Sequence, residues 1–208
     1  MLCLRDTTLG LLIKLIEDVS VSLDDDYYNA LVQRIVAQQL SIQAARTIYG
    51  RLVSSLGRQT PIETLLTSDD TYRSLGVSLR KISYLKDLAT KVLSREIDLA
   101  GLNHMDDSGV ISHLTQVKGI GQWTAEMFLI FSLGRTNVLS AGDVALCRAV
   151  QWLYHGTIDL GTELFDRWSP YNTIASLYLW ESINSGYVDR FKSVRDALNS
   201  RGEVRYDC

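Results

Sequence analysis

The apolar residues of this chain recur every three or four positions along most of its length, which is the spacing of one face of a helix. In residues 79–94, for example, Ile82, Leu85 and Leu88 fall on a single helical stripe. Only two prolines interrupt 208 residues, and segments with the alternating pattern of a strand are weak. Because 46% of the residues are hydrophobic, a sizeable core can form. We therefore predict a compact all-α fold.

Local signals mark where the helices begin and end. Ser41 follows a break at residues 36–41 and is a good N-cap for the helix after it. Thr60-Pro61 with Glu63 has the form of a capped helix start. We expect helical segments at 28–56 with that break, from 60 onward, and at 79–94, 107–114, 122–133, 140–154, 170–185 and 188–200.

Composition narrows the class of protein without pointing to a ligand. The net charge is -3, so bulk charge does not favour nucleic acid, although main-chain donors can bind phosphate in a protein of any net charge. The three cysteines Cys3, Cys147 and Cys208 lack metal-ligand spacing and cannot supply a four-cysteine iron–sulfur cluster. Reduced thiols of this kind indicate an intracellular protein, and we predict neither a signal peptide nor a membrane span.

A glycine motif separates two of the predicted helices. Gly119 and Gly121, within Val117–Gly121, permit a tight hairpin and the close approach of a ligand to the backbone. The free N–H groups at the start of the next helix suit a phosphate. Taken alone, the motif fits a plain helix-connecting turn equally well.

Asp143 follows in the segment Ser140-Ala141-Gly142-Asp143. A carboxylate beside the anomeric carbon of a nucleotide can stabilise the oxocarbenium-like sugar that forms when an N-glycosidic bond breaks. The same spacing is a capping pattern in which Ser140 caps the helix and the acid only holds its start. From spacing alone the capping interpretation is preferred.

The order of these elements resembles the helix-hairpin-helix–Gly/Pro–Asp DNA glycosylases, and among them the 3-methyladenine DNA glycosylase II branch. Three further stretches carry the resemblance: the Gln-Gln-x-Ser segment at 38–41, the Gly-x-Ser-x-x-Lys element at 76–81 and the C-terminal helix after Trp168. The similarity spans roughly residues 28–182. It implies one two-lobed module over 1–208, with about 60–150 in one lobe, about 1–59 plus 151–208 in the other, and Asp143 in the cleft between them.

The resemblance also implies roles for individual side chains. Asp143 is the essential carboxylate. Trp123 stands where relatives that also cut the strand carry a lysine for a Schiff base, so we expect base removal alone. Trp123 and Trp180 are expected to stack on a cationic alkylated base, with Met127 and Tyr178 as further pocket candidates, although Met127 and Tyr178 also suit a core.

The remaining implied contacts are to the DNA backbone and to the gap left by the base. Gln39 would fill that gap, with Gln38 and Ser41 beside it. The hairpin would bind a phosphate through Lys118, Gly119, Ile120 and Gly121. A structural Na⁺ or K⁺ on the carbonyls of Thr115, Val117 and Ile120 is possible, and no other cofactor is expected. The basic residues Arg80, Lys81, Lys86 and Lys91 would either follow the DNA backbone or form a solvated helix face.

Three alternatives remain open at this stage. The first is the same scaffold with another specificity, such as uracil, hypoxanthine or mismatched adenine. The second is a non-catalytic module that binds bent or damaged DNA. The third is a helical interaction domain that does not bind DNA. The favoured hypothesis is a monomeric glycosylase that acts on double-stranded DNA containing alkylated purines.

Overall fold

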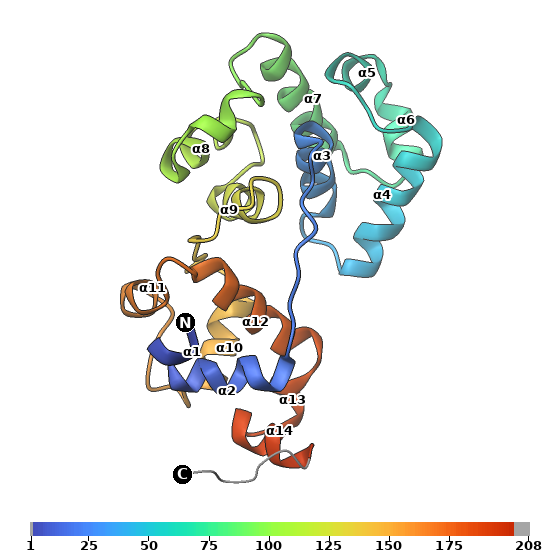
Figure 1. Ribbon diagram of the computed structural model, residues 1–208. Helices are drawn as coiled ribbons and strands as arrows, with labels where there is room; N and C mark the ends of the chain where they lie inside the picture. Colours follow the sequence, from blue (N-terminus) through green and yellow to red (C-terminus); the bar gives the residue numbers. More distant parts are fainter. Residues whose placement is uncertain (1, 202–208) are drawn as a thin grey trace. The chain divides into compact units, whose positions relative to one another are not determined.

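The computed structural model describes residues 2–201, and every regular element in that range is helical (Figure 1). The all-α prediction is therefore confirmed for this part of the chain. The described residues divide into two compact units, one made of 2–22 with 135–201 and the other of 23–134. Between residues 2 and 201 no helix combines the length and the apolar character that crossing a membrane requires.

The first unit joins the two ends of the described chain. Its helices are α1 (Leu2–Arg5), α2 (Thr7–Ile16), α10 (Val144–Leu153), α11 (Thr162–Trp168), α12 (Asn172–Asn184), α13 (Tyr187–Arg190) and α14 (Val194–Ser200). The second unit holds α3 (Tyr27–Ala37), α4 (Ile42–Leu56), α5 (Pro61–Leu66), α6 (Asp69–Ser74), α7 (Leu79–Leu93), the 3-10 helix η1 (Gly101–His104), α8 (Asp107–Leu114) and α9 (Gln122–Phe131).

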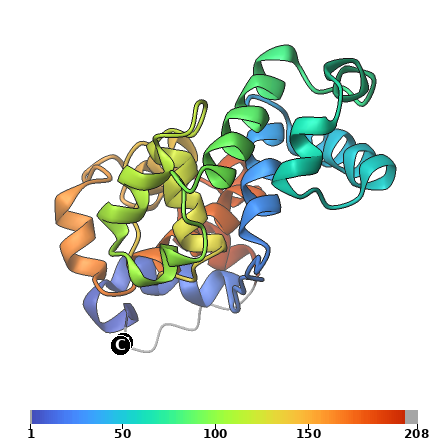
Figure 2. The ribbon, with the colours of Figure 1, turned by 90° about the horizontal axis from the view of Figure 1, so that it is seen from above.

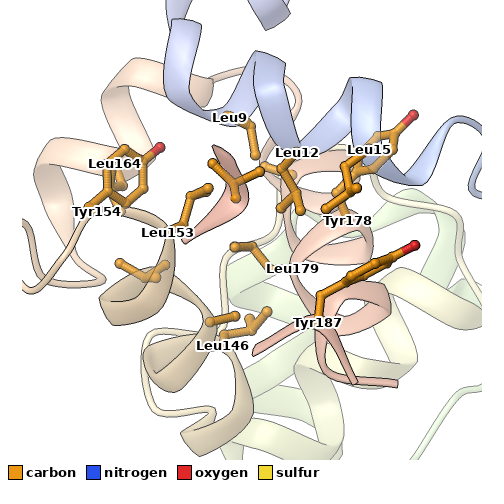
Figure 3. Close-up of a cluster of buried hydrophobic side chains, with 14 of the residues drawn as sticks. Leu9, Leu12, Leu15, Leu146, Leu153, Tyr154, Leu164, Tyr178, Leu179 and Tyr187 are labelled. Carbon is orange, nitrogen blue, oxygen red and sulfur yellow. The ribbon is translucent and has the colours of Figure 1, made fainter. Parts of the chain in front are cut away.

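The core of the first unit forms where α2 lies against α10, α12 and α14. Both views of the ribbon place the blue α2 beside the red α12 (Figures 1 and 2). Leu9, Leu12 and Leu15 come from one stripe of α2 and are fully buried against side chains such as Leu146 and Leu179 (Figure 3). Burial of a side chain of this size contributes about 1.5–3 kcal/mol.

The second unit is built around α7. This helix packs against α3, α5 and α6, and it buries Ile82, Leu85 and Leu88, the stripe expected from sequence. The remaining contacts join α3 to α4 and α9, and α8 to α9. Leu31 and Ile35 of α3 are fully buried in the same unit.

Most expected helix boundaries are confirmed. Ser41 caps α4, and Thr60 forms a complete capping box with Glu63 at the start of α5. The expected helix at 140–154 is wrong at its start, because α10 begins only at Val144. The expected helix at 188–200 is two short helices, α13 and α14, and the expectations did not include α1, α2, α6 or α11.

The division between the units differs from the lobes expected near residues 60 and 150. Residues 23–59 pack with 60–134, because α3 packs against α4 and also against α7 and α9. Residues 135–150 pack with the two chain ends, because α10 contacts α2 and α12. The boundaries in the structure are therefore 22/23 and 134/135.

A buried carboxylate, that of Asp6, joins distant segments of the first unit through hydrogen bonds. Asp6 is the N-cap of α2, where it accepts the N–H groups of Thr8 and Leu9, and its other oxygen accepts the Tyr154 hydroxyl at 2.6 Å and the Trp168 indole N–H at 3.0 Å. Its side chain is almost fully buried. Burial alone would raise the pKa of Asp6, but these hydrogen bonds and Arg167 outweigh it and lower the pKa below the ordinary value of 3.8.

This lowered pKa predicts a loss of stability in acid. A carboxyl group whose pKa is depressed by folding stabilises the protein above its unfolded pKa, and that contribution disappears as pH falls through the folded pKa. We expect Asp6→Asn to reduce the free energy of unfolding at neutral pH by about 2 kcal/mol, since it removes charge-assisted hydrogen bonds. Urea unfolding at pH 7 and below pH 4 measures both effects. An unchanged acid dependence in Asp6→Asn would assign the acid sensitivity to other groups.

Candidate functional site

The glycine motif forms a tight turn between α8 and α9. Gly119 has a φ of 82°, in the left-handed region, and a Cβ at this position would overlap the ring of Tyr84. Val117 accepts the N–H of Ile120 at 3.0 Å, which closes the turn. Gly121 then serves as the N-cap of α9. Backbone conformation and close packing together require glycine at 119.

The turn presents main-chain donors at the start of α9. Within residues 2–201, the N–H groups of Gly119, Gly121 and Gln122 have no hydrogen-bond acceptor. Those of Gly121 and Gln122 lie at a helix N-terminus, where the partial charge is positive. The N–H of Lys118, by contrast, donates to the Asp87 carboxylate at 2.8 Å in the free protein. The arrangement is chemically suited to an oxyanion.

The Gln-Gln-x-Ser segment is the turn from α3 to α4. Gln38 is the C-cap of α3, and its Nε2 donates to the Gly119 carbonyl at 2.7 Å. Gln39 is exposed, has a φ of 56°, and accepts an Arg80 N–H at 2.6 Å through its Oε1. Ser41 is exposed and accepts the N–H of Ala44. Of the three, Gln38 is directed to the hairpin and Gln39 and Ser41 face outward.

The basic residues of α7 do not form a freely solvated helix face. Each one binds another part of the second unit rather than solvent alone. Lys81 is buried, its Nζ donates to the Val36 carbonyl at 2.8 Å, and burial together with the charge of Arg80 lowers its pKa. Arg80 binds Gln39, and Lys86 binds Asp69. Lys91 binds Asp87 and the Gln116 carbonyl.

The first turns of α9 carry two of the expected pocket residues. Trp123 is half exposed, at 50%, in the first turn after the hairpin. Met127, one turn further, is only 4% exposed and belongs to the interior. Trp123 thus offers an indole surface, whereas Met127 fits the core interpretation that its residue type favours.

Asp143 is itself the N-cap of α10. Its Oδ1 accepts the N–H of Leu146 at 2.9 Å, and the residue is 7% exposed. The expectation that Ser140 caps this helix is wrong, because Ser140 is fully buried before the helix and its carbonyl accepts the Asp143 N–H at 3.0 Å. The cap holds the carboxylate in one orientation at the end of a helix where an anion is favoured.

The two aromatic candidates of α12 differ. Tyr178 is 9% exposed, its hydroxyl donates to the Glu17 carbonyl at 2.9 Å, and burial raises its pKa. Figure 3 draws it among the leucines of the core of the first unit. Trp180 is only partly buried and packs on the edge of the same cluster. The core interpretation therefore holds for Tyr178.

The residues that could bind a metal ion were considered separately from the DNA contacts in the sequence. Residues 2–201 contain no group of three or more His, Cys, Asp or Glu side chains placed to hold a metal ion. The carbonyls considered for a monovalent cation, those of Thr115, Val117 and Ile120, all lie in the hairpin, and that of Val117 already accepts one hydrogen bond. Cys3 and Cys147 are free thiols, and Cys208 lies outside the described residues.

Sequence reasoning missed two residues that shape the hairpin. Tyr84 lies against Gly119, and Asp87 accepts the Lys118 N–H. Both follow Lys81 at intervals of three residues, so a polar and aromatic stripe on α7 was the available signal. The sequence also did not single out two exposed aliphatic side chains. Ile42, just after the Gln39 turn, is 68% exposed, and Leu79, just before Arg80, is 58% exposed.

Comparison with known proteins agrees with this arrangement. The model of the HhH-GPD superfamily of base excision DNA repair proteins matches residues 32–161. A DNA-3-methyladenine glycosidase from Bacillus halodurans, solved by crystallography, is 39% identical with a TM-score of 0.82, over 95% of this chain and 94% of that one. The Schizosaccharomyces pombe 3-methyladenine DNA glycosylase, solved with abasic DNA, is 31% identical with a TM-score of 0.76, over 86% and 92% of the two chains.

A third relative is longer. A Bacillus subtilis protein provisionally described as a DNA-3-methyladenine glycosylase is 32% identical over 173 residues. The aligned part is 77% of this chain and 60% of that relative, so the chain spans less than two thirds of its length.

Proposed function

Since the chain belongs to the HhH-GPD superfamily of base excision DNA repair proteins, we propose that it is a DNA glycosylase that releases alkylated purines of the 3-methyladenine type. The observation that carries the proposal is the oriented, nearly buried carboxylate of Asp143 at the start of α10. The names of the two solved relatives above 30% identity support this substrate class.

In the proposed mechanism the hairpin binds first. The N–H groups of Gly119 and Gly121 hold a DNA phosphate, and Gln39 fills the gap when the damaged nucleotide leaves the stack. The base stacks on the indoles of Trp123 and Trp180, which suits an electron-poor, cationic ring. Met127 and Tyr178 are buried, each in the core of its own unit.

Asp143 then serves the chemical step. As the bond between the sugar and the base breaks, its carboxylate stabilises the positive charge on the sugar and orients the attacking water. An alkylated purine is already cationic and departs readily, so strong acid assistance is unnecessary. The products are the free alkylpurine and an abasic site.

Several features of the proposal go beyond the family assignment. Trp123 has no amine for a Schiff base with the sugar, so we infer hydrolysis without strand cleavage. A monovalent cation on the carbonyls of Thr115, Val117 and Ile120 would only fix the hairpin amides in place. The partner is double-stranded DNA, and the protein acts as a monomer.

Incubation with duplexes that each contain one lesion tests the proposal. We expect release of 3-methyladenine or 7-methylguanine from methylated DNA, and strands that stay intact until hot alkali is added. A duplex with uracil or hypoxanthine serves as the matched control. Release of uracil alone, or breaks before alkali treatment, would contradict the alkylpurine specificity or the hydrolytic mechanism respectively.

A further inference from the structure

One face of α7 contacts both loops that the proposed function assigns to DNA. Four of its five residues recur at the three- and four-residue spacing of a helix face, and the fifth, Lys81, directly follows Arg80. The first two, Arg80 and Lys81, bind Gln39 and the last turn of α3 just before it, and the later ones lie against the Gly119 hairpin. The whole face comprises Arg80, Lys81, Tyr84, Asp87 and Lys91.

Lys81 completes the end of α3. The N–H of Leu40 donates to the Ala37 carbonyl at 3.2 Å rather than to that of Val36, which an unbroken helix would use. The ammonium of Lys81 takes this place on the Val36 carbonyl at 2.8 Å. Carbonyls at a helix C-terminus carry partial negative charge, so a buried cation suits the position. The chain reverses just beyond it, at the positive φ of Gln39.

The hairpin is fixed to the same helix. Asp87 accepts the Lys118 N–H at 2.8 Å, and the ring of Tyr84 fills the space that a side chain at Gly119 would need. Gln38 then joins the two loops directly through the Gly119 carbonyl. The turn and the hairpin are therefore held to one helix and to each other.

We propose that Lys81 is a positioning residue, which sets the Gln39 turn at a fixed distance from the Gly119 hairpin. Binding of a phosphate at the hairpin then brings Gln39 to the gap in the duplex in the same step. Arg80 restrains the Gln39 side chain in the free protein. This inference rests on the proposed function of the site, but it concerns the geometry of DNA binding and not the chemistry.

The first test measures insertion into DNA without base release. The probe is a duplex with a tetrahydrofuran abasic analogue opposite 2-aminopurine, whose fluorescence rises when its stacking is disturbed. Two variants change Lys81: Lys81→Met keeps the aliphatic part of the side chain, and Lys81→Arg keeps the charge. The control is Lys86→Met, because the ammonium of Lys86 binds Asp69 on α6 and not a loop. We expect Lys81→Met to lose most of the fluorescence change, Lys81→Arg to recover part of it, and Lys86→Met to match the wild type.

The second test separates positioning from a general loss of structure. Excision rates under single-turnover conditions are measured for Lys81→Met, Gln39→Ala and the double variant, with melting temperatures for each. We expect each single change to slow excision from duplex DNA about 10-fold or more, the cost of a small misplacement. If Lys81 acts through Gln39, the double variant is little slower than either single one; independent effects would multiply.

Multiplying effects, or normal fluorescence in Lys81→Met, would overturn the inference. If Lys81→Met does not fold, Lys81→Gln replaces it in both tests, because it keeps a donor without the charge or the reach. Absence of excision in the wild type would count against the proposed function, whereas the fluorescence test would still decide the role of Lys81.

Discussion

Replacement of Asp143 by asparagine is expected to abolish base release while the protein stays folded and bound to DNA. Asparagine is as good an N-cap as aspartate, so the hydrogen bond to Leu146 and the start of α10 survive. Only the negative charge is lost, and with it the stabilisation of the sugar cation. Removal of one preorganised electrostatic group at a reacting centre costs roughly 10³-fold in rate. Single-turnover release of 3-methyladenine, with binding to abasic DNA measured in parallel, checks both parts.

The chain offers a matched control for this change. Asp106 caps α8 in the same way, through a hydrogen bond from Gly109 at 2.7 Å. Asp106→Asn makes the same substitution at the same kind of helix position and should leave excision unchanged. Full activity in Asp143→Asn would reduce the carboxylate to a helix cap and favour the DNA-binding module without catalysis.

Replacement of Gly119 by alanine is expected to destabilise the second unit and to weaken DNA binding. The positive φ of 82° disfavours any side chain, and the new Cβ would overlap the Tyr84 ring. Strain and displacement of the ring or the hairpin together should lower the free energy of unfolding by about 3 kcal/mol. Affinity for abasic DNA should fall at least about 10-fold, since the hairpin amides move. Urea unfolding and fluorescence anisotropy provide the two measurements.

Gly121→Ala separates this effect from a general intolerance of the hairpin. Gly121 has an extended backbone, with a φ of -94°, and a Cβ there meets nothing within 4 Å. The variant should unfold at the same urea concentration as the wild type. In the double variant Tyr84→Ala with Gly119→Ala, the overlap disappears while the φ strain persists, so part of the stability should return. Equal loss from both glycine variants would contradict the role given to Tyr84.

The sequence predicted the parts of this structure that depend on neighbouring residues. Ser41, Thr60 and Glu63 cap their helices through hydrogen bonds to residues three positions away, and such contacts follow from local sequence alone. The stripe through Ile82, Leu85 and Leu88 was predictable for the same reason. The cap predicted at Ser140 was wrong, because Asp143 caps α10 instead. The carbonyl of Asp143 accepts the first hydrogen bond of that helix, from the N–H of Cys147.

Contacts between distant segments could not be predicted in this way. Lys81 and Val36 are 45 positions apart, and Gln38 and Gly119 are 81 apart. No local pattern distinguishes a lysine that closes a helix from one that faces water. The lobe boundary expected near residue 60 came from the family resemblance, and only the packing shows that α3 and α4 belong with α7, which places the boundary at 22/23.

The phosphate site proposed for the hairpin bears on how the protein tolerates mutation. Its donors are main-chain N–H groups, which every amino acid except proline supplies. Lys118 is exposed and its ammonium forms only a solvated ion pair with Asp87 at 3.7 Å, so its side chain can vary as long as the amide keeps its bond to Asp87. Most single substitutions in the hairpin therefore remove no hydrogen-bond donor. The sensitive position is Gly119, where the neighbouring Tyr84 ring leaves no room for a side chain.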